Sequence, residues 1–100
     1  MLEAALSTLI DNSRQAGAGR VTIAARVDGE RVVVTVTDDG PGIAPGDRDR
    51  VFEPFFTTRR AAGGTGLGLP ILRSLLEAHR GTIALDAGEG AVFRLTLPVA

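Results

Sequence analysis

The sequence predicts an α+β domain in two layers, with helices packed on one face of a mostly antiparallel mixed sheet. Three observations support this: an apolar stripe at helical spacing near the N-terminus, a second such stripe further on, and two pairs of strand-like runs joined by turn residues. The chain has 100 residues with 44% hydrophobic content, which suits one small domain with a single core. We therefore expect residues 1–100 to form one domain.

The first half of the chain predicts a helix followed by a hairpin. Apolar residues recur at helical spacing over residues 2–16, and Gly17 follows as a natural stop. Strand-like runs at 21–27 and 32–37 flank Asp28 and Gly29, a pair that favours a tight turn. One face of this hairpin is predicted to be core and the other, with its Thr and Arg side chains, to face water. With Asp28 and Gly29 as the loop, the predicted register places Ala25 opposite Val32, Ile23 opposite Val34 and Val21 opposite Val36.

The second half predicts a long loop, a helix and another strand pair. Residues 39–65 are rich in Gly and Pro, and a stretch of this length without regular structure is often a lid or binding loop. A second helix is expected over residues 67–79, with Ile71, Leu72, Leu75 and Leu76 inward and Pro70 tolerated in the first turn. Runs at 82–85 and 92–97, around a turn at 88–90, complete the sheet.

The composition excludes several classes of protein. All 11 basic residues are Arg, so the chain has neither a P-loop lysine nor a Schiff-base lysine. Without Cys and with one His, His79, it cannot form a thiolate zinc site, a disulfide or a Cys–His pair. The charges nearly cancel, and no apolar run approaches a membrane span of about 20 residues. We expect no nucleic-acid or direct membrane contact and a cytoplasmic location, with a parent protein that could carry a membrane anchor.

Asp38 breaks the pattern of its strand. It falls on the same alternation as Val34 and Val36, so its carboxylate should point to the buried face. Residues 38–42 also read as a plain turn, because Asp, Gly and Pro are all turn formers. The functional alternative is a carboxylate at the floor of a pocket, where it accepts a hydrogen bond from a ligand's amino group while Gly40 and Gly42 let the backbone approach.

Other candidate residues are open to two interpretations. Asn12, at the margin of the first apolar stripe, is either a solvated amide or an oxygen ligand for Mg²⁺. The alternating glycines of residues 64–69 directly precede a helix, where they form either a flexible connector or a phosphate-binding loop. Arg59 and Arg60 are either solvated charges or phosphate contacts. His79, in the last turn of the second helix, fits a structural role better than that of a phosphate acceptor.

Taken in order, these segments resemble the ATP-binding domain of sensor histidine kinases, a branch of the superfamily that includes gyrase, Hsp90 and MutL ATPases. Residues 9–12 are similar to the N box, 38–42 to the first glycine box D-x-G-x-G, and 51–56 to the F box. Residues 64–69 match the second glycine box G-T-G-L-G-L, and 90–93 resemble the closing segment. Five motifs in the family's order are a specific match, and they imply the Bergerat ATP-binding fold.

The resemblance also implies a function and a site. Bound Mg-ATP would present its γ-phosphate to a histidine on a separate phosphoacceptor and dimerisation domain, with a response regulator downstream. Asn12 would hold Mg²⁺, Asp38 would bind the adenine amino group, and residues 43–63 would be the ATP lid. The phosphate candidates are Arg14, Arg59 and Arg60. The full set of implied ATP-binding residues is Asn12, Asp38, Gly40, Gly42, Ile43, Phe52, Thr65, Gly66, Leu67, Gly68 and Leu69.

Departures from the family pattern keep alternatives open. Thr8 occupies the N-box position where kinases often have Asn and the ATPase relatives a catalytic Glu, so no residue of this chain is assigned as catalytic with certainty. Gln15 and Ala16 replace a usual basic residue and an aromatic. A docking module with a degenerate nucleotide site and an anti-sigma serine kinase of the same fold are the alternatives. Because the family domain usually begins earlier, we expect a truncated N-terminus and an open sheet edge.

Overall fold

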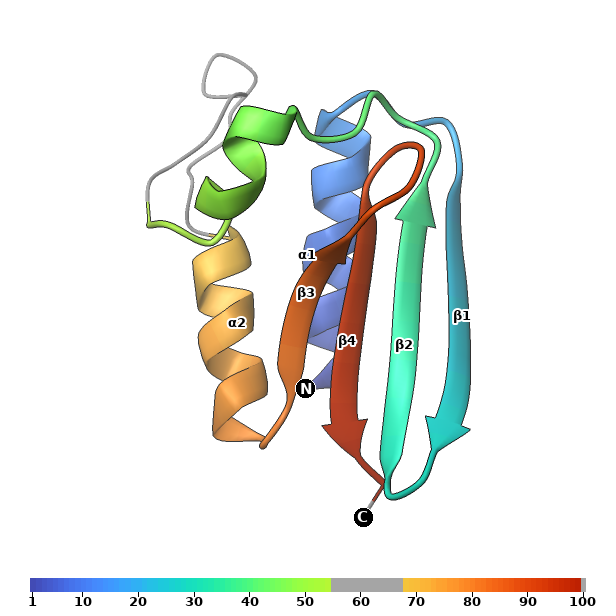
Figure 1. Ribbon diagram of the computed structural model, residues 1–100, viewed down its shortest axis with the longest axis vertical. Coiled ribbons are helices and arrows are strands. Elements are labelled where there is room, and N and C mark those ends of the chain that lie inside the picture. Colours follow the sequence, from blue (N-terminus) through green and yellow to red (C-terminus); the bar gives the residue numbers. More distant parts are fainter. Residues whose placement is uncertain (55–67, 100) are drawn as a thin grey trace.

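The structure, a computed structural model, describes residues 1–54 and 68–99 of the chain (Figure 1). Its elements follow in the order α1 (Leu2–Gln15), β1 (Val21–Asp28), β2 (Arg31–Asp38), a 3-10 helix η1 (Pro45–Arg50), α2 (Gly68–Ala78), β3 (Thr82–Asp86) and β4 (Val92–Pro98). All of the expected helices and strands among the described residues are therefore present, with boundaries close to those predicted.

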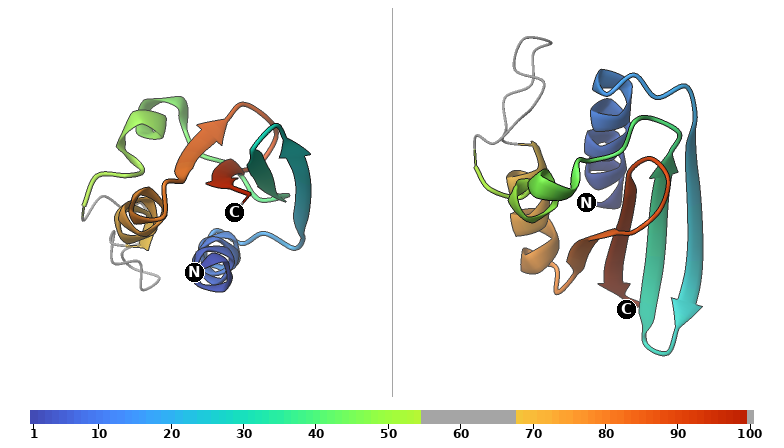
Figure 2. Two further views of the ribbon diagram at one scale, coloured as in Figure 1. Left: turned by 90° about the horizontal axis from the view of Figure 1, so that it is seen from below. Right: turned by 45° about the horizontal axis from the view of Figure 1, so that its top comes forward.

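The strands form one sheet in the order β1-β2-β4-β3, and every pairing is antiparallel. Both α-helices lie on one face of this sheet, as the view along the strands in Figure 2 shows. The two-layer α+β architecture is confirmed, and among the described residues the sheet is antiparallel throughout instead of mixed. Because β2 and β4 are the central strands, the end of β2 and the start of β4 lie side by side beneath the helices.

The core fills the space between the helices and the two central strands. Leu9, Leu72, Leu76 and Leu95 are each no more than 2% exposed, which accounts for the amphipathic spacing of both helices. The expectation for Ile71 is wrong, because this side chain is 61% exposed: it lies one residue before Leu72 and is turned about 100° away from the buried stripe. The buried cluster consists of Ala5, Leu9, Val34, Val36, Leu72, Leu76, Phe93 and Leu95.

The predicted hairpin register is wrong by two residues. Asp28 pairs with Arg31 across the strands, so the loop is Gly29 and Glu30 instead of Asp28 and Gly29. Gly29 has a φ of 62°, whereas Glu30 is not among the residues with positive φ. This arrangement has the left-handed glycine first in the loop, as in a type II′ turn, and it spares Asp28 a positive φ. Ala25 consequently lies opposite Val34, Ile23 opposite Val36 and Val21 opposite Asp38.

The shift by two residues preserves which side chains share a face, but the expected core face is realised only in part. Val34 and Val36 of β2 are buried, whereas Ile23 is 45% exposed and Val27 is 69% exposed on β1. The reason is the position of the helices: α1 packs against β2 and α2 against β3, and neither covers β1. Within the described part of the chain, β1 is therefore an edge strand.

Candidate nucleotide site

Asp38 ends β2 with its side chain turned into the protein, and the residue is only 6% exposed. Its Oδ1 accepts hydrogen bonds from the backbone N–H groups of Gly40 and Ala91, each at 3.0 Å. Its Oδ2 accepts the hydroxyl of Ser13 at 2.7 Å. The inward orientation predicted from strand alternation is confirmed. A carboxylate taken out of water requires such donors, since an unpaired buried charge is very costly.

The donors to Asp38 come from three separate parts of the fold. Ser13 lies on α1 four residues after Leu9, in the buried stripe of the helix. Ala91 directly precedes β4, and its carbonyl also accepts the backbone N–H of Asp38 at 3.0 Å, so hydrogen bonds run in both directions between the two residues. Neither Ser13 nor Ala91 was predicted as a site residue. Ser13 could have been noticed as a polar residue in the apolar stripe, whereas a backbone donor such as the Ala91 N–H leaves no sequence signal.

Two glycines allow the β3–β4 turn to reach Asp38. Gly90 has a φ of 69°, and a Cβ atom built on it would overlap the backbone carbonyl oxygen of Asp38. Gly42 has a φ of 76°, and a Cβ there would lie 2.9 Å from the carbonyl oxygen of Gly90. Any L side chain at either position would be both strained and crowded. Gly42 therefore supports the site structurally, and Gly40 does so through the hydrogen bond described above.

Asp39 differs from its neighbour in being exposed. The N–H groups of Arg20 and Gly19 donate to its Oδ1 at 2.9 and 2.7 Å, and they hold the pKa of the Asp39 carboxyl below its ordinary value of 3.8. The Asp39 N–H in turn donates to the carbonyl of Arg20 at 3.2 Å. Asp39 thus connects the segment before β1 to the end of β2 through hydrogen bonds. Of the two neighbouring carboxylates, only that of Asp38 is buried.

The N box and the start of α2 meet beside this carboxylate. A Cβ built on Gly68 would lie 3.5 Å from Cγ2 of Thr8 and 4.0 Å from Oδ1 of Asn12. Asn12 is half-buried and directly precedes Ser13, and its side-chain amide has no hydrogen-bond partner among the described residues. The hydroxyl of Thr8 donates to the Ala4 carbonyl of its own helix at 3.0 Å. Within residues 1–54 and 68–99, the Asn12 amide therefore keeps its hydrogen-bonding capacity for a ligand.

Three further candidates are apolar side chains of the described residues. Ile43, Phe52 and Leu69 are partly buried and pack against the core. The guanidinium of Arg73 lies 5.6 Å from the centre of the Phe52 ring, a cation–π contact that joins this part of the F box to α2. Five of the predicted residues lie outside the described part of the chain: Arg59, Arg60, Thr65, Gly66 and Leu67.

Arg14 lies away from these groups. Successive residues of a helix are about 100° apart, so Arg14 points about 200° around α1 from Asn12. Its side chain is 78% exposed and lies 3.8 Å from the Asp11 carboxylate. A phosphate held between Asn12 and Gly68 would face the other flank of α1, out of line with the Arg14 side chain.

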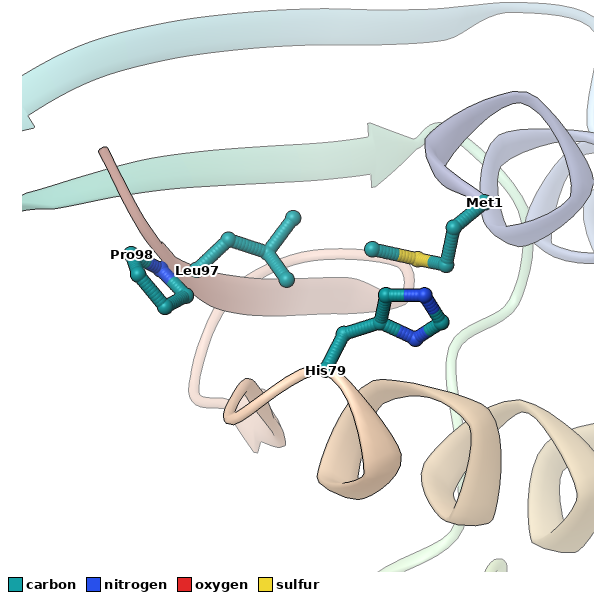
Figure 3. Close-up of a pocket in the computed structure, with 4 residues that line it drawn as sticks. All are labelled: Met1, His79, Leu97 and Pro98. Atoms are coloured by element: carbon teal, nitrogen blue, oxygen red, sulfur yellow. The ribbon is translucent and has the colours of Figure 1, made fainter. Parts of the chain in front are cut away.

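A cavity of about 320 Å³ lies at the opposite end of the molecule, lined by Met1, His79, Leu97 and Pro98 (Figure 3). These residues come from the start of α1, the turn after α2 and the end of β4. Because β4 pairs with the end of β2 at Val92, this cavity is about 20 Å along the strand from Asp38. Nδ1 of His79 lies 3.0 Å from the Leu75 carbonyl, in agreement with a structural role.

Two kinds of feature are absent from the described residues. Within 1–54 and 68–99, no helix has the length and apolar character that a membrane crossing needs. The same residues contain no group of three or more His, Cys, Asp or Glu side chains that could hold a metal ion.

Comparison with known proteins identifies the family. All 100 residues match the family described as histidine kinase-, DNA gyrase B- and HSP90-like ATPases. The sensor histidine kinase ZraS of Salmonella typhi is 46% identical over 84 residues, which cover 81% of this chain and 18% of the relative. CpxA of Escherichia coli K12 is 35% identical over 100 residues, which cover 96% of this chain and 22% of the relative. The chain thus spans about a fifth of the length of these relatives.

Solved structures agree with this assignment. The mycobacterial sensor histidine kinase MprB has a TM-score of 0.81 at 32% identity, over 95% of this chain and 68% of the other. The catalytic domain of the histidine kinase ThkA has a TM-score of 0.82 at 33% identity, over 97% and 65%. Full-length ShkA in complex with AMPPNP has a TM-score of 0.69 at 36% identity, over 96% and 22%. The chain therefore belongs to the histidine kinase-, DNA gyrase B- and HSP90-like ATPases, and within them to the ATP-binding catalytic domains of sensor histidine kinases.

Proposed function

We propose that this domain binds Mg-ATP beside Asp38 and presents the γ-phosphate to a histidine on a separate domain of its parent protein. The observation that supports this most directly is the buried Asp38 carboxylate, which is held by three donors and retains acceptor capacity. An exocyclic amino group is the donor that such a carboxylate fits. Because the parent would be longer than this chain, a phosphoacceptor and dimerisation domain and a response regulator are the proposed partners, at a cytoplasmic location.

In this proposal the phosphates lie near the start of α2. The N–H groups at a helix start favour anions, and Gly68 leaves room beside Asn12 for them to approach. The Asn12 amide oxygen is a hard ligand of the kind that Mg²⁺ prefers, and Mg²⁺ commonly uses one or two protein ligands together with phosphates and water. The Asn12 side chain, with no other partner among the described residues, fits this role. When bound, Mg²⁺ would neutralise phosphate charge.

The protein's contribution to the chemistry would be positioning. Phosphoryl transfer depends mainly on aligned groups and charge neutralisation, and the nucleophile would be the histidine of the partner domain. Residues 43–63 would form the lid over the nucleotide, and its described part, through Ile43 and Phe52, is anchored on the core. We also propose that Arg59 or Arg60 contacts the phosphates, that the nucleotide is contacted by Thr65, Gly66 and Leu67, and that residues 1–100 form one domain.

Isothermal titration with a non-hydrolysable ATP analogue tests the binding step. The unmodified protein should bind the analogue more tightly with Mg²⁺ than without it. Asp38→Ala should weaken binding by about 10- to 150-fold, the value of a hydrogen bond to a charged group of about 1.5–3 kcal/mol. Asp28→Ala is the matched control, because this carboxylate is 69% exposed in the hairpin. Asn12→Ala should remove the Mg²⁺ dependence while circular dichroism shows an unchanged fold.

Two results would contradict the proposal. No binding by the unmodified protein would favour a docking module with a degenerate site, and equal binding by Asp38→Ala would reject the role of this carboxylate. The transfer step is tested with labelled ATP and the parent protein's phosphoacceptor domain. Label on histidine supports a histidine kinase, whereas label on a serine of a partner protein would favour the serine-kinase alternative.

A further inference from the structure

The hydrogen bonds at Asp38 leave one side of its carboxylate open. A carboxylate has about four acceptor positions, two on each oxygen. Both positions on Oδ1 are used, by the N–H groups of Gly40 and Ala91. From the part of the chain that the structure describes, Oδ2 has one donor, the Ser13 hydroxyl at 2.7 Å. The open acceptor position is therefore on Oδ2, the same oxygen that Ser13 holds, and a ligand's amino group would share that oxygen with the serine.

The contact between Ser13 and Asp38 is fixed by the packing of α1 on the sheet. Ser13 is 6% exposed and lies in the buried stripe of α1, 25 residues away from Asp38 in the sequence. The two backbone donors hold the carboxylate from the loop and from β4, and Ser13 holds it from the helix. Without the serine, the carboxylate would be fixed through one oxygen only, and the terminal torsion of an aspartate side chain is otherwise broad.

The direction of the Ser13 hydrogen bond also affects what the pocket can accept. A serine hydroxyl has one hydrogen, and here it is donated to Oδ2. Ser13 and Asp38 therefore both offer acceptors to a ligand and neither offers a hydrogen. Such a pair attracts an amino group and is unfavourable for a carbonyl oxygen in the same place, because two acceptors would then face each other without a hydrogen between them.

We propose that Ser13 is a positioning residue for nucleobase recognition: it orients Oδ2 of Asp38 toward the amino group of the base. This inference rests on the function proposed above and deepens it. A carboxylate that is oriented before the ligand arrives avoids the ordering cost on binding. The contribution of Ser13 should therefore appear in affinity only when the ligand carries the amino group that Oδ2 receives.

A two-by-two comparison isolates this effect. The unmodified protein and Ser13→Ala are each titrated with ATP and with purine riboside triphosphate, which lacks the amino group. Ser13→Ala should weaken ATP binding by about 3- to 10-fold, the range for one hydrogen bond, and should change binding of the purine analogue by less than about 2-fold. Ser7→Ala, on the exposed face of the same helix, is the matched control and should leave both affinities unchanged.

The outcomes separate the two proposals. Equal losses for both nucleotides would show a purely structural role for Ser13, and the absence of any loss would show no role; either result overturns the inference while leaving ATP binding intact. Failure of the unmodified protein to bind either nucleotide would overturn the proposed function and this inference with it. If Ser13→Ala does not fold, Ser13→Cys, which keeps a similar shape with a weaker donor, supports the inference through a selective loss for ATP and contradicts it through equal losses.

Discussion

Replacing Gly90 by alanine tests how closely the β3–β4 turn must approach Asp38. Two effects are expected to add. An alanine at a φ of 69° is in the left-handed region, which costs about 1–2 kcal/mol and is offset by about 0.4–1 kcal/mol through reduced freedom of the unfolded chain. The new Cβ would also overlap the Asp38 carbonyl oxygen, so the turn must move away.

This displacement of the β3–β4 turn accounts for most of the expected loss in folding stability. It would break the two hydrogen bonds between Asp38 and Ala91, one of them to the carboxylate, for about 3 kcal/mol together. The total for Gly90→Ala is then about 4 kcal/mol, a large fraction of the roughly 5–15 kcal/mol that stabilises a small domain. At about 4–8 °C per kcal/mol, Tm should fall by about 15–30 °C.

Gly29→Ala is the matched control. Gly29 has a similar φ of 62°, but a Cβ there meets nothing within 4 Å. Its replacement should cost only the backbone effect, about 1 kcal/mol or less. Urea denaturation of the two variants followed by circular dichroism gives both free energies of unfolding. If the two variants lose equal stability, the close packing of the turn against Asp38 contributes nothing, and the reasoning is refuted.

Two further predictions concern the ends of helices and strands. Arg80 has a φ of 61° in a Schellman turn, where the Gly81 N–H donates to the Leu76 carbonyl and the Arg80 N–H to the Glu77 carbonyl. Arg80→Gly removes the strain of a side chain in this conformation and should raise the free energy of unfolding by about 1 kcal/mol. An unchanged or lower value in urea denaturation would contradict this. Because the folded pKa of Asp39 is lowered, its charge stabilises the fold above a pH of about 3.8, and this contribution is lost as the pH falls through the folded pKa. In Asp39→Asn, whose amide oxygen can still accept both N–H groups, stability measured from pH 7 to pH 3 should fall less steeply than in the unmodified protein, and identical profiles would show that the Asp39 charge is not responsible.

The fold class and the element order could be predicted because they depend on periodicity along the chain. The apolar spacing of α1 and α2 follows directly from which residues each helix buries, and the alternation in β2 places Val34, Val36 and Asp38 on one face. The hairpin register depended instead on a single turn. Asp28-Gly29 and Gly29-Glu30 both contain the required glycine, and a positive φ at Gly29 fits either loop. The register is decided by Asp28, which has no positive φ and pairs with Arg31.

Burial of β1 could not be predicted from local pattern. Its Val, Ile and Ala alternate like those of a half-buried strand, but whether that face is covered depends on where α1 and α2 lie across the sheet. Ile71 was assigned to the core from helical spacing, but it lies about 100° around α2 from Leu72 and is exposed. Which flank of the apolar stripe is covered again depends on how α2 lies on the sheet. These errors concern packing between elements that are distant in the sequence, where periodicity carries no information.

The site shows how a contact between elements distant in the sequence could still be predicted. Ser13 and Asp38 are the two buried polar residues in the described ranges 1–54 and 68–99. One lies in the apolar stripe of a helix and the other on the apolar face of a strand. Each would be costly there alone, because a buried polar group without a partner loses its hydrogen bonds to water. When the helix and the strand pack against each other, the arrangement of lowest free energy places Ser13 next to Asp38, so that the hydroxyl donates to the carboxylate. Asp38 was noticed for breaking its strand's pattern, and the same test applied to α1 would have selected Ser13 and predicted the contact between them.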